Sequence, residues 1–107
     1  MQTRRQARKA HEISVCQARR DACMRDWQAA LDEINRIVDA EMELLSLADP
    51  AARENDPEYD KEVRRRALHS TFERTKIARL ERDMAWQGAC AQESRIQELR
   101  ESMANTN

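Results

Sequence analysis

The sequence predicts an all-α protein, an antiparallel hairpin of two long, coiled-coil-like helices. The only two prolines, Pro50 and Pro57, lie in one acidic segment near the middle of the 107-residue chain. The long stretches on either side are rich in Ala, Glu, Arg and Leu and contain no helix breaker except Gly88. Such a composition is typical of long helices. A residue before proline is biased out of the helical region, so we expect two helices rather than one.

The helix starts have recognisable local signals. Thr3 and Gln6 have the spacing of a capping box. Asp56 and Pro57 mark the second start, because Asp is a preferred N-cap and Pro suits the first helical position. The predicted boundaries are a first helix over 3–47, an acidic hinge over 48–56 and a second helix over 57–104, all in a single domain over 1–107.

Apolar residues of the first helix form three adjacent rows with a seven-residue repeat. The three rows make a face broader than the seam of a two-stranded coiled coil, which predicts contact with more than one neighbour. Arg20 and Glu41 interrupt one row, either as its solvated edge or as polar residues that fix the register. The rows are Ile13, Arg20, Trp27, Ile34 and Glu41; Cys16, Cys23, Ala30, Ile37 and Leu44; and Met24, Leu31, Val38 and Leu45.

The second helix carries two apolar sets that point in different directions. One hairpin partner covers one side only, so we expect a homodimeric four-helix bundle or a bundle completed by a partner helix. Phe72 and Trp86 share one side and contact either another chain or the same monomer. Gly88 either permits close helix approach near residues 16–20 or is a neutral choice. The first set is Tyr59, Val63, Ala67, Ser70, Ile77, Leu80, Met84 and Ala91, and the second is Leu68, Phe72, Trp86, Cys90 and Ile96.

No catalytic, cofactor or metal site is predicted. His11 and His69 are the only histidines, and we interpret both as solvated helix residues. Cys16, Cys23 and Cys90 lack C-x-x-C spacing and are interpreted as small buried residues, with a redox or metal role as the alternative. Reduced thiols favour a cytoplasmic location. The sequence has no apolar run of the ~18 residues that a membrane-spanning helix needs.

These features predict a non-enzymatic interaction module, a small cytoplasmic adaptor or chaperone that holds a protein partner or a second copy. Large apolar groups dominate such contacts, and the predicted contact residues are Trp27, Leu31, Ile34, Val38, Leu45, Phe72, Trp86 and Ile96. The alternative is a nucleic-acid-binding accessory protein with phosphate contacts from Arg64, Arg65, Arg66, Arg74 and Lys76. Since the net charge is −1 and acids interrupt the basic run, a solvated, ion-paired face is the preferred interpretation.

In length, two-helix layout and charge density, the whole chain resembles the helical-hairpin chaperones and small stalk proteins of bacterial type III secretion systems. The resemblance implies binding to a secretion substrate or to an export ATPase. A phage-encoded structural or inhibitor protein would have the same outline.

Overall fold

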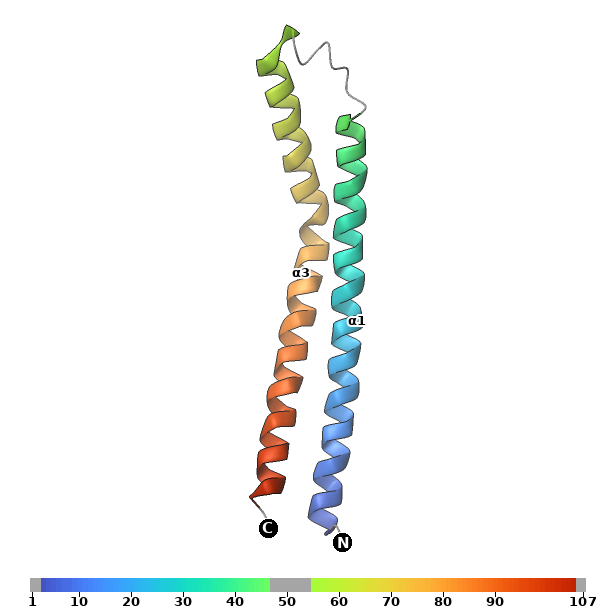
Figure 1. Cartoon of the computed structure of the whole chain (residues 1–107), viewed down its shortest axis with the longest axis vertical. Helices are drawn as coiled ribbons and strands as arrows, with labels where there is room; N and C mark the ends of the chain where they lie inside the picture. Colours follow the sequence, from blue (N-terminus) through green and yellow to red (C-terminus); the bar gives the residue numbers. More distant parts are fainter. Residues whose placement is uncertain (1–2, 47–54, 106–107) are drawn as a thin grey trace. The chain divides into compact units, whose positions relative to one another are not determined.

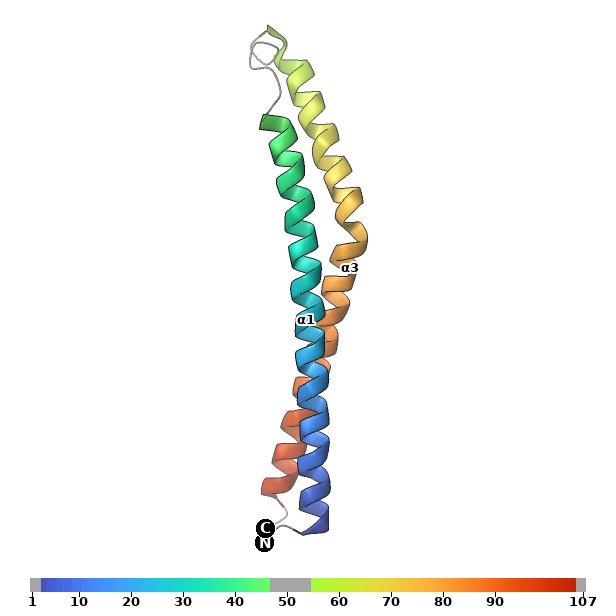
Figure 2. The same cartoon turned by 90° about the vertical axis from the view of Figure 1, so that its right-hand side faces the viewer.

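The computed structural model of the chain describes residues 3–46 and 55–105. Two long helices make up almost all of this part, α1 (Arg4–Ser46) and α3 (Pro57–Ala104), and they run antiparallel (Figure 1, Figure 2). The described residues contain no β-strand. The predicted all-α helical hairpin is therefore confirmed. Most of the predicted hinge over 48–56 lies outside the described residues.

Both predicted helix starts have the expected hydrogen bonds. Thr3 Oγ1 accepts from the Gln6 backbone N–H at 3.1 Å, and Gln6 Oε1 accepts from the Thr3 N–H at 3.0 Å, which completes the capping box. Asp56 Oδ1 accepts from the Tyr59 N–H at 3.0 Å and caps α3. Because these side chains satisfy N–H groups that have no partner within the helix, each helix begins within a residue of its predicted position.

The chain divides into two compact units, each built from part of α1 and part of α3. The terminal unit comprises Met1–Ala29 and Glu81–Asn107, and the middle unit comprises Ala30–Leu80. Each unit is described separately below.

The terminal unit has an apolar core in which Ile96 is fully buried. Cys16 and Leu99 are buried beside it, and Ile13 packs against this cluster. Gly88 lies where the helices approach closely, because a Cβ built on it would stand 2.9 Å from Cys23 Sγ. The predicted role of Gly88 in close approach is therefore supported, although its neighbour is Cys23 rather than residues 16–20.

Among its described residues, the middle unit buries only small side chains. These are Ala30, Thr75 and Ala78. The Thr75 hydroxyl donates to the carbonyl oxygens of Thr71 at 2.8 Å and Phe72 at 3.1 Å, so this buried polar group is satisfied within its own helix. Small residues in a seam shorten the distance between helix axes, and larger side chains are left outside it.

The buried side of α3 follows neither apolar set predicted for the second helix. From the first set, Ile77 and Met84 are each 70% exposed and Leu80 is 57% exposed. From the second set, Ile96 is the one buried member. Alanines occupy much of the seam instead, and a search for large apolar residues passes over them. The buried residues of α3 are Thr75, Ala78, Ala85, Ala89, Ile96 and Leu99.

Candidate interaction surface

Exposed apolar side chains are concentrated in the middle unit. The described part of the chain has ten large apolar side chains that are exposed, and only Met84 and Trp86 among them belong to the terminal unit. The other eight are Val38, Met42, Leu44, Tyr59, Leu68, Phe72, Ile77 and Leu80. Single exposed apolar residues are ordinary, but a concentration of large ones marks an interaction surface.

Four of these residues, Val38 and Met42 on α1 with Leu68 and Phe72 on α3, form what we call the apolar strip together with the half-buried Leu31 and Leu45 on α1. On α1, Val38 follows the seam residue Ile37, and Met42 lies one helical turn further on. On α3, Phe72 follows the seam residue Thr71, and Leu68 lies one turn before it.

The two halves of the strip lie on the same side of the helix pair. In an antiparallel pair, residues that directly precede the seam meet on one side, and residues that directly follow it meet on the other. The terminal unit illustrates the first case, since Glu12 precedes Ile13, Arg95 precedes Ile96, and the two charged groups pair at 3.2 Å. In the middle unit, Val38 and Phe72 both directly follow the seam, so they share the opposite side.

Phe72 carries a cation on its ring. The Arg79 guanidinium carbon lies 3.8 Å from the ring centroid, within the range of a cation–π contact. Phe72 is nevertheless 51% exposed. The α3 half of the strip therefore combines an accessible aromatic group with positive charge.

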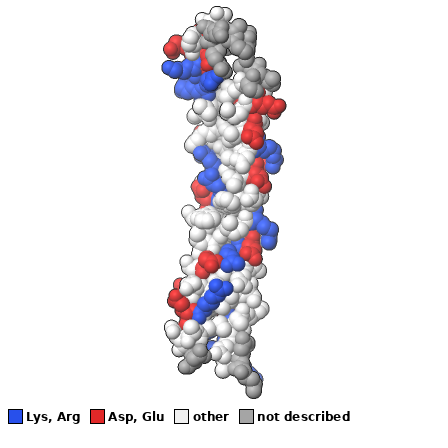
Figure 3. All heavy atoms as spheres, viewed as in Figure 1, with Lys and Arg blue, Asp and Glu red and all other residues white. Residues whose placement is uncertain are grey.

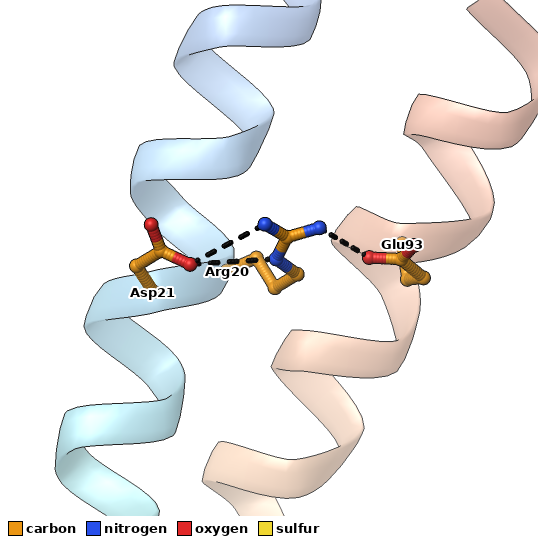
Figure 4. A network of polar contacts seen from close by, with 3 residues as sticks. All are labelled: Arg20, Asp21 and Glu93. Carbon is orange, nitrogen blue, oxygen red and sulfur yellow. Dashed lines mark hydrogen bonds and ion pairs between the residues drawn. The ribbon is translucent and has the colours of Figure 1, made fainter. Parts of the chain in front are cut away.

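Charged side chains in the seam join α1 to α3 within each unit. In the terminal unit, Arg20 pairs with Glu93 at 2.7 Å and with Asp21 at 3.4 Å (Figure 4). The hydrogen bond that Arg20 donates to Glu93, with additional attraction from Asp21, holds the pKa of Arg20 above its ordinary value. In the middle unit, Arg74 pairs with Glu41, whose side chain is only 14% exposed.

These contacts bear on the two interpretations of Arg20 and Glu41. Each side chain reaches the opposite helix rather than solvent alone. The two pairs have opposite polarity, with the arginine on α1 in one and on α3 in the other. A shifted register would leave these charges without their partners, so the geometry favours a register-fixing role.

The predicted contact residues have different environments. Trp27 and Trp86 pack on each other within the terminal unit, with ring centroids 6.0 Å apart and an interplanar angle of 48°. Ile34 is half-buried in the middle unit. Ile96, predicted as a partner contact, lies in the terminal core and presents no surface to a partner. Leu31, Val38, Leu45 and Phe72 belong to the apolar strip.

The arginines predicted to contact phosphate are paired with acids. Arg64 contacts Asp60 at 3.0 Å, and Arg74 contacts Glu41. Arg65 and Arg66 share Glu62 at 2.7 Å and 3.1 Å, and Lys76 is exposed. On the face in Figure 3, basic and acidic groups lie beside one another with uncharged surface between them. This arrangement lacks the single-sign field that typifies a nucleic-acid interface.

Hydrogen bonds from Arg65 first, and then from Arg66, lower the pKa of Glu62 to about 2. The same contact with Glu62 raises the pKa of Arg65. Both groups therefore keep their charges at neutral pH.

A hollow of about 410 Å³ lies in the terminal unit. Val15 and Cys16 give it apolar lining, and the arginines Arg19 and Arg95 also line it. Arg95, which lines it, pairs with Glu12 and with Glu98. The residues around it are His11, Glu12, Val15, Cys16, Arg19, Gln92 and Arg95.

The three cysteines are free thiols, with Cys16 buried, Cys23 half-buried and Cys90 exposed. Cys90 thus departs from the prediction that all three are buried. Over residues 3–46 and 55–105, no group of three or more His, Cys, Asp or Glu side chains could hold a metal ion. Within the same residues, neither helix has an apolar stretch suited to crossing a membrane.

The fold places this chain in the class of all-α proteins with two antiparallel helices. Its middle unit leaves large apolar side chains exposed. Comparison with known protein families, curated proteins and solved structures finds no match for this chain.

Two members of the strip were absent from the predicted contact residues. Met42 stands outside the three seven-residue rows, but its spacing of four residues from Val38 could have placed it on the same side. Leu68 was assigned to an apolar set of the second helix, and its spacing of four from Phe72 carries the same signal. Leu68 is exposed, while the buried residues of α3 in the middle unit are small. A search for large apolar residues does not find such small seam residues.

Proposed function

We propose that this protein is a non-enzymatic interaction module, a small cytoplasmic adaptor or chaperone that holds a helical protein partner on the apolar strip of its middle unit. One observation carries the proposal. Among the described residues of the middle unit, two alanines and a threonine are buried, while eight large apolar side chains are exposed, four of them in the strip. Covering such groups is a major source of free energy in protein association.

The form of the strip supports a helix as the bound element. Its α1 and α3 residues recur at helical spacing, and an amphipathic helix laid between two helices presents matching i, i+3, i+4 and i+7 contacts. The resemblance in outline to type III secretion chaperones and stalk proteins agrees with such a role.

The test compares the wild-type chain with a strip variant, Val38→Glu with Phe72→Glu. The matched control, Gln87→Glu with Ser94→Glu, adds the same charge at exposed positions of the terminal unit. Light scattering measures self-association, and affinity capture from the native host with mass spectrometry measures binding to other proteins. We expect the strip variant to lose association, of whichever kind, and the control to keep it.

Two results would count against the proposal. One is a wild-type chain that stays monomeric at all concentrations and captures no protein. The other is association that the strip variant leaves intact while circular dichroism shows unchanged helix content.

A further inference from the structure

We propose that the occupant of the apolar strip is a second copy of this chain, packed with α1 of each middle unit against α3 of the other. This inference rests on the proposed function and names its partner. It is carried by the charges that border the strip on the two helices.

In the middle unit, the two helices carry charge of opposite sign. Residues 30–46 of α1 contain five carboxylates and a single arginine, Arg36. Residues 57–80 of α3 contain seven Lys and Arg side chains and four carboxylates. The described part of α1 in this unit is thus acidic and that of α3 is basic, while the strip residues on both helices are uncharged.

The residues beside the strip keep this asymmetry. On α1, the exposed Asp32 and Asp39 directly follow the strip residues Leu31 and Val38. On α3, the exposed Glu73 directly follows Phe72, but two cations outnumber it, since Lys76 lies one helical turn beyond Phe72 and Arg79 stacks on the Phe72 ring. A partner surface that fits this strip therefore presents a basic edge to α1 and an acidic edge to α3. A second copy has both edges.

A symmetric dimer can join two such strips in two ways, and the charges distinguish them. A twofold axis parallel to the helices places α1 on the partner's α3, with acidic edges against basic edges. An axis across the helices places α1 on the second α1, with like charges opposed, which disfavours that packing. Both arrangements make each neighbouring pair of helices antiparallel, so the charges alone distinguish them.

Helix register predicts which charges meet. Glu41 pairs with Arg74 within one chain, so residues 39 and 76 lie at nearly the same height along the pair. A twofold axis parallel to the helices preserves height. Asp39 of one copy therefore meets Lys76 of the second copy, and each dimer contains this contact twice.

Sedimentation equilibrium of the full chain tests the proposal, and we expect a mass twice that of the 12.5 kDa monomer. Asp39→Lys and Lys76→Glu should each weaken the dimer roughly tenfold or more, and the combined variant should recover to within about threefold of wild type. Asp26→Lys makes the same charge change in the terminal unit and should leave the dimer unchanged. Circular dichroism checks helix content in every variant.

Disulfide trapping tests the arrangement separately. The background chain has Cys16, Cys23 and Cys90 replaced by alanine, and it carries either Met42→Cys or Phe72→Cys, two strip positions that the Glu41–Arg74 pair places at nearly the same height. We expect a disulfide-linked dimer when the two chains are mixed, and little from Met42→Cys alone. The charge-swap series keeps the proposal falsifiable if the cysteine-free chain does not fold.

The outcomes separate this inference from the proposed function. A chain that is monomeric at every concentration but captures another protein through the strip overturns the second-copy inference and leaves the proposed function standing. Failure of the combined charge variant to recover, or preferential trapping of Met42→Cys with itself, overturns the α1-on-α3 packing.

Discussion

The terminal and middle units use the same two helices differently. The terminal unit buries Ile96 and Leu99 around Cys16, and it exposes two large apolar side chains. Where the structure describes it, the middle unit buries only Ala30, Thr75 and Ala78, and it exposes eight large apolar side chains. The contrast teaches that one antiparallel helix pair can either place its large residues in its own seam or leave them exposed. The size of the seam residues decides between these uses.

The largest effect should come from emptying the terminal core. Ile96→Ala removes most of a fully buried side chain, and we expect a loss of about 2–5 kcal/mol in the free energy of unfolding. Phe72→Ala in the middle unit should cost less than about 1 kcal/mol when the chain is dilute enough to be monomeric, because the ring is half exposed. Urea unfolding followed by circular dichroism measures both. Equal losses would contradict the contrast between the units.

The close approach at Gly88 gives a smaller effect with a specific partner. Alanine in a helix is favoured over glycine by about 1 kcal/mol, but in wild type the added Cβ would meet Cys23 Sγ at 2.9 Å. We expect Gly88→Ala to bring its full gain in unfolding free energy only in a Cys23→Ala background. Ser94→Ala, at an exposed site of α3, should behave alike in both backgrounds. The same gain for Gly88→Ala in both backgrounds would show that the contact imposes no constraint.

The seam ion pair of the middle unit should have a modest effect. A double-mutant cycle of Glu41→Ala and Arg74→Ala should show a coupling of about 0.2–1 kcal/mol that declines as salt is added. The Glu33–Arg36 pair, at 2.9 Å within α1, is the control because it joins no second helix. A substitution that weakens the contact between α1 and α3 should lower the Glu41–Arg74 coupling energy and leave the Glu33–Arg36 coupling energy unchanged. If both coupling energies changed equally, Glu41 would have no register-fixing role.

The smallest effect should be the acid response of Glu62. Its pKa is lowered to about 2 from an ordinary value of 4.5, so its contribution to folding stability is present above about pH 4.5 and lost as the pH falls toward 2. Glu62→Gln should flatten this part of the stability profile, measured by urea unfolding between pH 2 and pH 6. Glu98→Gln, at another arginine-paired carboxylate, is the control. If the free energy of unfolding of the Glu62→Gln variant falls toward pH 2 as steeply as that of wild type, Glu62 is not the source of this acid response.

The helix boundaries could be predicted because their signals are local. Thr3 with Gln6 and Asp56 with Pro57 act within one helical turn, and the structure has the corresponding hydrogen bonds. The broad apolar face of α1 was also predictable, since its residues recur with a fixed period. The strip residues Leu31, Val38, Leu45 and Phe72 were identified from the same periodicity.

The composition of the α3 seam could not be predicted in this way. Ile77, Leu80 and Met84 have the spacing of a buried stripe, yet all three are exposed, while Ala78, Ala85 and Ala89 are buried. An alanine contributes little to an apolar pattern, and its preference for a seam depends on how closely the other helix approaches. That distance is a property of the pair and not of either helix.

The sequence by itself determined that this protein is helical, where its helices begin, and that it has more apolar surface than two helices can cover. These properties follow from capping, proline placement and periodicity, which act over a few residues. Only the tertiary structure decided which apolar residues are covered, because burial depends on the fit between two helices. It placed Ile96 in a core, set Gly88 against Cys23, and left Val38 and Phe72 exposed on one side of the pair.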